Sequence, residues 1–126
     1  MTLRSPLGRA RGLGSSRSGS DHYWAQRVTA VALVPLVLWF VVSLITITSS
    51  DLVSVQEWVS KPYNATLLLL TLLTGIWHGL LGLQVVIEDY VHSPIGKHLS
   101  LIFLRLIAAF LAISVSISTL KLALGG

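Results

Sequence analysis

One long apolar stretch constrains the fold of this chain more than any other feature. Residues Ala65 to Ile87 are twenty-three consecutive residues without a formal charge, and they include one ionisable side chain, His78, near the middle. A helix rises about 1.5 Å per residue, so a helix of this length can cross a hydrocarbon layer about 30 Å thick. An ionisable group at membrane depth normally faces protein, a cavity or a ligand rather than lipid. His78 is therefore a candidate functional residue.

Small residues surround His78 on the predicted helix. At about 100° per residue, one narrow face carries Thr71, Gly75, His78, Gly82, Val85 and Asp89. The two glycines leave room beside the imidazole for a flat ligand, and a neutral imidazole is a ready ligand for transition metals, including haem iron. Alternatively, Gly75 and Gly79 allow a neighbouring helix to approach closely, with His78 hydrogen-bonding across the contact. The spacing alone leaves both interpretations open.

The composition is typical of an integral membrane protein. Hydrophobic residues make up 53% of the chain and charged residues 11%, against about a quarter charged in soluble domains. The predicted fold is an all-α membrane protein with three transmembrane helices, at about residues 25–48, 65–89 and 99–124. A polar connector at 49–64 and a short turn at 91–98 separate them. Pro35 should bend the first helix, and in the third Arg105 and Lys121, with only fifteen residues between them, should extend toward opposite interfaces.

The basic residues indicate an orientation. The net charge is +4, and four of the nine basic residues lie within the first seventeen positions. We divide the chain into a basic tail, residues 1–21, and a membrane anchor, residues 22–126. The excess of basic residues on the cytoplasmic side of membrane proteins predicts a cytoplasmic N-terminus and a periplasmic C-terminus. Residues 21–27 and 89–98 then share the cytoplasmic side. Since the remaining basic residues mostly flank apolar spans, nucleic acid is not an expected partner.

The chain contains no cysteine, which excludes disulfides, thiolate metal sites and covalent c-type haem. A six-coordinate haem bound to His78 would need a second axial ligand. The other histidines, His22, His92 and His98, lie at predicted helix ends. Even His92 is about 21 Å from His78 along a continued helix. A haem would therefore be shared with another subunit.

Three further residues are candidates for binding. Tyr90 and Asp89 lie about three turns beyond His78, where a phenol could donate a hydrogen bond to a quinone carbonyl and a carboxylate could hold or relay a proton. The alternatives are an interfacial aromatic residue and an ordinary helix-end charge. Arg27 could extend to the headgroups, or it could pair with an anionic ligand group or with Asp89.

Two motifs carry a resemblance to a known family. The first span is entered by Arg27-Val28-Thr29-Ala30, and His78 is followed after ten residues by Asp89-Tyr90. Together with the basic tail and three helices, this pattern resembles the D-type hydrophobic membrane anchor of succinate dehydrogenase (respiratory complex II), in its alphaproteobacterial form. The resemblance implies a non-catalytic subunit in the bacterial inner membrane, which is favoured over the mitochondrial inner membrane. The implied partners are a flavoprotein subunit, an iron–sulfur subunit and a cytochrome b556-type second anchor, with which the chain would complete a helix bundle.

The resemblance also implies roles for individual residues. His78 would be an axial ligand of haem b, opposite a histidine of the cytochrome b556-type anchor. Tyr90 would hydrogen-bond a ubiquinone carbonyl, with Asp89 supporting it. Arg27 would contact a haem propionate or line the quinone pocket.

Two other function classes compete with this interpretation. One is a small proton-coupled transporter in which His78 carries the proton, although the chain shows no internal repeat of the kind common in transporters. The other is a structural membrane subunit without a cofactor.

Overall fold

The computed structural model describes residues 17–125, and this part of the chain is entirely helical, with no strand. Its helices are α2 (Arg17–Ile47), α3 (Leu52–Ser60), α4 (Pro62–Tyr90) and α5 (Pro94–Ala123). Within the described range, α2, α4 and α5 are long and apolar enough to cross a membrane. The predicted all-α fold with three spans is confirmed. Most of the predicted basic tail lies outside the described residues.

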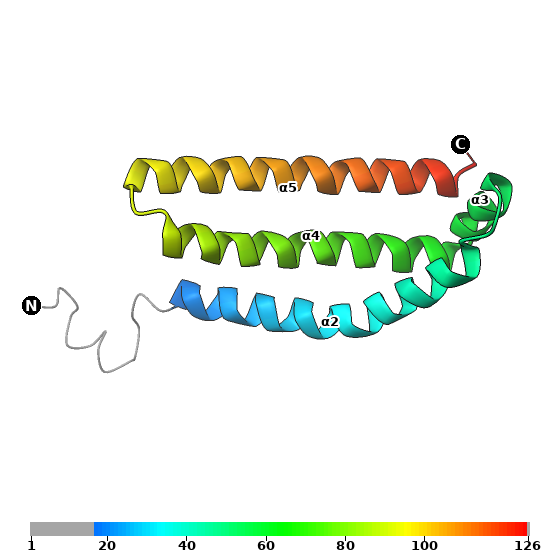
Figure 1. Ribbon diagram of the computed structural model, residues 1–126, viewed down its shortest axis with the longest axis horizontal. Helices are drawn as coiled ribbons and strands as arrows, with labels where there is room; N and C mark the ends of the chain where they lie inside the picture. Colours follow the sequence, from blue (N-terminus) through cyan, green and yellow to red (C-terminus); the bar gives the residue numbers. More distant parts are fainter. Residues whose placement is uncertain (1–16, 126) are drawn as a thin grey trace, which may run out of the picture.

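The three long helices lie side by side in one row (Figure 1), with α4 in contact with both α2 and α5. The start of α2 and the turn between α4 and α5 lie at one end of the row, while α3 and the end of α5 lie at the other. Residues 21–27 and 89–98 therefore share one end of the molecule, as the three-span topology predicts.

The contact between α2 and α4 follows a seven-residue spacing. A hydrogen bond joins Thr29 to His78, and because the helices run antiparallel, equal steps of seven place Leu36 opposite Thr71 and Ser43 opposite Asn64. All of these except the half-buried His78 are buried. Such spacing is characteristic of helices that pack at a small crossing angle. The Thr29–His78 hydrogen bond sets the height of His78 relative to α2, and the buried positions at seven-residue spacing agree with that register.

Very little apolar surface is buried inside the described part of the chain. The buried hydrophobic residues are Leu36, Val59 and Leu81, whereas most large apolar side chains of the long helices are exposed. In a membrane protein such surface contacts lipid or another membrane subunit. The row therefore presents two broad apolar faces, one on each side.

The expected polar connector contains a helix of its own. The Asp51 side chain accepts a hydrogen bond from the Ser54 backbone N–H at 3.0 Å and so caps α3. The ring of Trp58 stacks on that of Trp39 in α2, with 5.7 Å between centroids. Asn64, buried in the first turn of α4, donates to the Trp58 carbonyl at 2.9 Å. These contacts hold α3 against the end of the row.

Proline positions explain the helix boundaries. Pro62 and Pro94 begin α4 and α5, where the missing proline N–H has no intrahelical partner to lose. The turn between α4 and α5 is consequently shorter than the predicted 91–98, because it spans only residues 91–93. Pro35 lies inside α2, which curves over its second half (Figure 1), as the loss of a backbone hydrogen bond at an internal proline predicts.

Candidate functional site

The imidazole of His78 is bonded to the neighbouring helix α2. Its Nδ1 lies 2.9 Å from the Thr29 hydroxyl oxygen, and Thr29 is only 3% exposed. The same hydroxyl lies 2.7 Å from the Ala25 carbonyl and 3.1 Å from the Gln26 carbonyl. When Nδ1 carries the proton of a neutral His78, the Thr29 oxygen accepts from it while the Thr29 hydroxyl donates to one of these carbonyls. In that tautomer Nε2 keeps its lone pair.

A hydrogen bond at one ring nitrogen is a common feature of metal-binding histidines. A ligating imidazole normally donates its other N–H to an oxygen acceptor, which fixes the tautomer and the ring orientation. Here the acceptor belongs to a buried residue whose own position is held by two backbone carbonyls. The interaction with Thr29 thus holds the His78 ring at its Nδ1 atom.

Open space lies beside the glycines that flank His78. A Cβ atom built at Gly75, Gly79 or Gly82 would meet no other atom within 4 Å. At about 100° per residue, these positions lie roughly 40° to 100° around α4 from His78, on one face of the row. Neither α2 nor α5 approaches them closely, so the contacts of the described chain give no reason for their small size. The residues that the sequence places on one narrow face of α4 do not all point the same way, because Thr71 and His78 turn toward α2.

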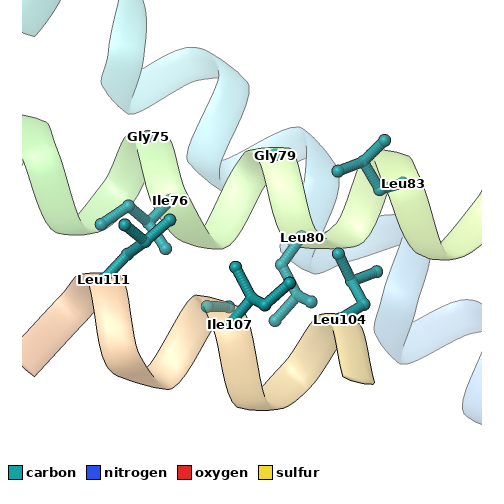
Figure 2. Close-up of a pocket in the computed structure, with 9 residues that line it drawn as sticks. Gly75, Ile76, Gly79, Leu80, Leu83, Leu104, Ile107 and Leu111 are labelled. Carbon is teal, nitrogen blue, oxygen red and sulfur yellow. The ribbon is translucent and has the colours of Figure 1, made fainter. Parts of the chain in front are cut away.

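A shallow apolar groove borders this glycine face. Gly75 and Gly79 lie above side chains of α4 and α5 that converge from both helices (Figure 2). The groove holds about 210 Å³ and is lined by Gly75, Ile76, Gly79, Leu80, Leu83, Leu104, Ile107, Ala108 and Leu111. None of these side chains carries a polar atom, so the groove can accept apolar groups but offers no chemistry of its own.

The described residues contain no group of three or more histidine, cysteine or acidic side chains that could hold a metal ion. A metal at His78 would therefore need the remaining ligands from outside this chain, as from a porphyrin and a second subunit. The residues present fit that case, since His78 supplies one oriented nitrogen beside open space.

Arg27 faces away from His78 within this chain. It lies two residues before Thr29, which is about 200° around α2, and it is exposed. Its guanidinium carbon lies 5.1 Å from the centroid of the Tyr23 ring, a cation–π contact. Pairing of Arg27 with Asp89, one of the alternatives considered from the sequence, is absent from the described structure.

Asp89 and Tyr90 end α4 at the same end of the row as the start of α2. Tyr90 is 76% exposed and lies about 18 Å along the helix from His78. Within residues 21–125 no hydrogen bond joins either side chain to another group. The structure thus brings His78 and Thr29 together and leaves Arg27, Asp89 and Tyr90 apart.

Two features of the structure are not predicted by the sequence interpretation. Thr29 enters it only as part of a motif, although its seven-residue spacing with Leu36 and Ser43 is a signal for a helix contact. The Nε2 atom of His22 is buried and has no hydrogen-bond partner in the described part of the chain, although the sequence places His22 simply at a helix end.

Comparison with known proteins identifies the family. Residues 1–116 match the family described as succinate dehydrogenase/fumarate reductase transmembrane subunit. The chain belongs to this family. It is 39% identical over 90 residues to the succinate dehydrogenase hydrophobic membrane anchor subunit of Rickettsia bellii, which covers 71% of each chain. It is 30% identical over 112 residues to that of Rickettsia prowazekii, covering 89% of this chain and 90% of the relative.

The relatives support the alphaproteobacterial resemblance. The hydrophobic membrane anchor subunit of Paracoccus denitrificans is 29% identical over 97 residues, covering 77% of this chain and 75% of the relative. All these relatives are named as anchors and not as catalytic subunits. The predictions of a succinate dehydrogenase membrane anchor and of a non-catalytic role are therefore confirmed.

Proposed function

We propose that this chain is the D-type anchor of a succinate:ubiquinone oxidoreductase, that His78 binds the iron of a haem b shared with a second anchor subunit, and that Tyr90 and Asp89 form part of the ubiquinone site. The observation that carries the proposal is the hydrogen bond between His78 and Thr29. In the tautomer with the proton on Nδ1, this bond leaves the Nε2 lone pair for coordination.

The surroundings of His78 support a haem shared between subunits. Within the described residues no group of three or more histidine, cysteine or acidic side chains could hold a metal ion, so His78 would hold the haem iron together with a residue of the cytochrome b556-type anchor. The open strip along Gly75, Gly79 and Gly82 gives room for the macrocycle and for helices of that partner. The haem would supply an iron that accepts and returns single electrons.

The end of the row that carries Asp89 and Tyr90 suits a quinone site next to the soluble subunits. Tyr90 is exposed and ends a helix, so its phenol is free to donate to a quinone carbonyl. Asp89, also exposed, can hold a proton at the same place. Arg27 lies near the same end of the row. A partner surface would have to bring its side chain toward the haem or the quinone.

The orientation completes the proposal. Basic residues gather toward the end of the chain that begins α2, which supports a cytoplasmic N-terminus and a periplasmic C-terminus in the bacterial inner membrane. The flavoprotein and iron–sulfur subunits would then bind at the Tyr90 end.

The test is an absorption spectrum of the complex purified from its own membrane. We expect His78→Ala to lose or strongly perturb a b-type haem spectrum, because the axial nitrogen is removed. His92→Ala, which changes an exposed histidine in the turn, should leave the spectrum unchanged. Tyr90→Phe should impair quinone reduction and keep the spectrum. An unchanged haem spectrum in His78→Ala would refute the ligand assignment, whereas a wild-type complex without a b-type haem spectrum would favour a cofactor-free anchor.

A further inference from the structure

Arg105 is a charged residue on the exposed surface of a membrane-spanning helix. It is exposed and is the twelfth residue of α5, about 16 Å along the axis from Pro94. The five acidic residues of the chain are Asp21, Asp51, Glu57, Glu88 and Asp89, and none of them lies in α5. The chain therefore provides no carboxylate in the same helix to neutralise Arg105.

The position of Arg105 relative to α4 shows that it lies deep in the span. It lines a groove together with Leu80 and Trp77 of α4, which places it close to the height of His78. An arginine at this depth is unfavourable unless an anionic group or water reaches its guanidinium. The long side chain of Arg105 can extend toward the headgroup level, where an anionic group or water from outside the chain can reach its guanidinium.

The groove beside Arg105 has one charged residue in an otherwise apolar lining. It holds about 270 Å³, and we call it the Arg105 groove; it is lined by Leu73, Ile76, Trp77, Leu80, Arg105, Ala108, Ala109 and Ala112. Arg105 is the only charged residue in this lining and lies at one end. The three alanines follow it along α5 in the direction away from the α4–α5 turn, and Trp77 forms one wall. A phospholipid has the same arrangement, with a charged group at one end and apolar chains along the rest.

The Arg105 groove lies on the opposite face of the row from the glycines. Trp77 is one residue before His78, about 100° around α4 in one direction, whereas Gly79 is about 100° around in the other. A ligand in the Arg105 groove is therefore separate from a haem or a partner helix at the glycine face.

We propose that the Arg105 groove binds an anionic phospholipid, with its phosphate at the Arg105 guanidinium and an acyl chain running toward Ala112. A planar guanidinium donates two parallel hydrogen bonds to phosphate oxygens, so arginine suits a phosphate that has left bulk water. The apolar lining favours an acyl chain over a polar peptide. This inference does not depend on haem or quinone binding.

The test measures lipid binding to the complex purified with its co-purifying subunits and stripped of lipid by detergent. Native mass spectrometry counts the bound molecules after addition of phosphatidylglycerol or, separately, phosphatidylcholine. We expect the wild type to prefer phosphatidylglycerol, and Arg105→Gln to reduce that preference about fivefold, the effect of one basic residue near an anionic lipid. Lys121→Gln, which removes an exposed charge outside the groove, should keep the preference.

A second variant tests the apolar part of the groove. Ala109 is exposed, so Ala109→Leu should fill the groove without disturbing the fold and should weaken the binding of both lipids. An unchanged lipid preference in Arg105→Gln would overturn the proposal. It would also be overturned if a photo-crosslinker at position 109 of the otherwise unaltered chain, activated in the native membrane, captured another protein subunit and not lipid. The haem spectrum of each variant reports separately on the proposed function.

Discussion

The hydroxyl oxygen of Thr29 and the Nδ1 atom of His78 are 2.9 Å apart across the contact between α2 and α4. These residues are 49 positions apart in the sequence, and their hydrogen bond occupies the Nδ1 atom of the imidazole. It also joins the first span to the second at the height where the glycine face opens. The orientation of His78 therefore depends on the packing of the two helices.

Thr29→Val tests this dependence. Valine keeps the shape of threonine but cannot accept the Nδ1 proton, so the imidazole loses its orienting partner. We expect haem affinity to fall about 10- to 100-fold, the usual effect of removing such a partner from a metal-bound histidine. Titration of the haem-depleted complex with haem measures the change. Thr29→Ser keeps the acceptor and should stay near the wild-type affinity, and equal affinity in all three proteins would contradict the orienting role.

Asn64 is expected to contribute to the stability of the α3–α4 connection. Its side-chain amide is buried and donates to the Trp58 carbonyl at 2.9 Å. Asn64→Ala should lower the free energy of unfolding by about 1 kcal/mol, since the hydrogen bond is lost. Thermal unfolding of the purified protein measures this. Ser60→Ala changes an exposed side chain in the same connection and should have a smaller effect, so a larger loss there would contradict the assignment.

The cap of α3 predicts a pH dependence. The Ser54 hydroxyl and backbone N–H hydrogen-bond the Asp51 carboxylate and lower the pKa of that carboxyl below its ordinary value. A lowered pKa in the folded state means that the ionised cap stabilises α3 above the unfolded-state pKa of about 3.9. This stabilisation is lost as the pH falls through the lower folded-state pKa.

Amide hydrogen exchange in α3 tests this pH dependence. Protection of the Ser54 amide should decrease in the acid range in the wild type. Asp51→Asn should remove that pH dependence and retain a cap, because asparagine caps helices without ionising. Asp51→Ala should expose the amide at every pH. The same acid-dependent loss in Asp51→Asn would show that another group is responsible.

The sequence predicts the spans well because hydropathy and length are local properties. It identifies His78 because one ionisable side chain interrupts an otherwise apolar stretch. It does not predict Thr29 as the partner of His78, since the α2–α4 register depends on packing between distant segments. The seven-residue spacing of Thr29, Leu36 and Ser43 is the one indication of that register in the sequence. Helix α3 is not predicted, because its nine residues are of mixed polarity. The N-cap residue Asp51 is the feature of the sequence that indicates a helix here.

The remaining site residues are less predictable for a different reason. Arg27, Asp89 and Tyr90 are exposed in the described chain, so any ligand that joins them requires surfaces that this sequence does not encode. A motif can indicate such residues, but the geometry of their site is completed by a partner.

A substitution at the glycine face should affect the isolated chain and the assembled complex in opposite ways. No atom of the described chain lies within 4 Å of a Cβ built at Gly79, so Gly79→Leu should not disturb the packing of α2, α4 and α5. Removing a glycine from a helix interior should even stabilise the helix, by up to about 1 kcal/mol. We expect the isolated chain in detergent to unfold at an equal or higher temperature.

In the assembled complex, the same Gly79→Leu substitution should be harmful. A leucine would fill the open strip beside His78, so haem content and association with the second anchor subunit should fall severalfold. The matched control is Ala109→Leu, a similar enlargement on the opposite face, which should leave haem content unchanged. The measurement is the haem-to-protein ratio of the purified complex. Normal haem and normal assembly in Gly79→Leu would show that the glycine face is occupied by lipid alone, and the shared haem would then have to approach His78 from elsewhere.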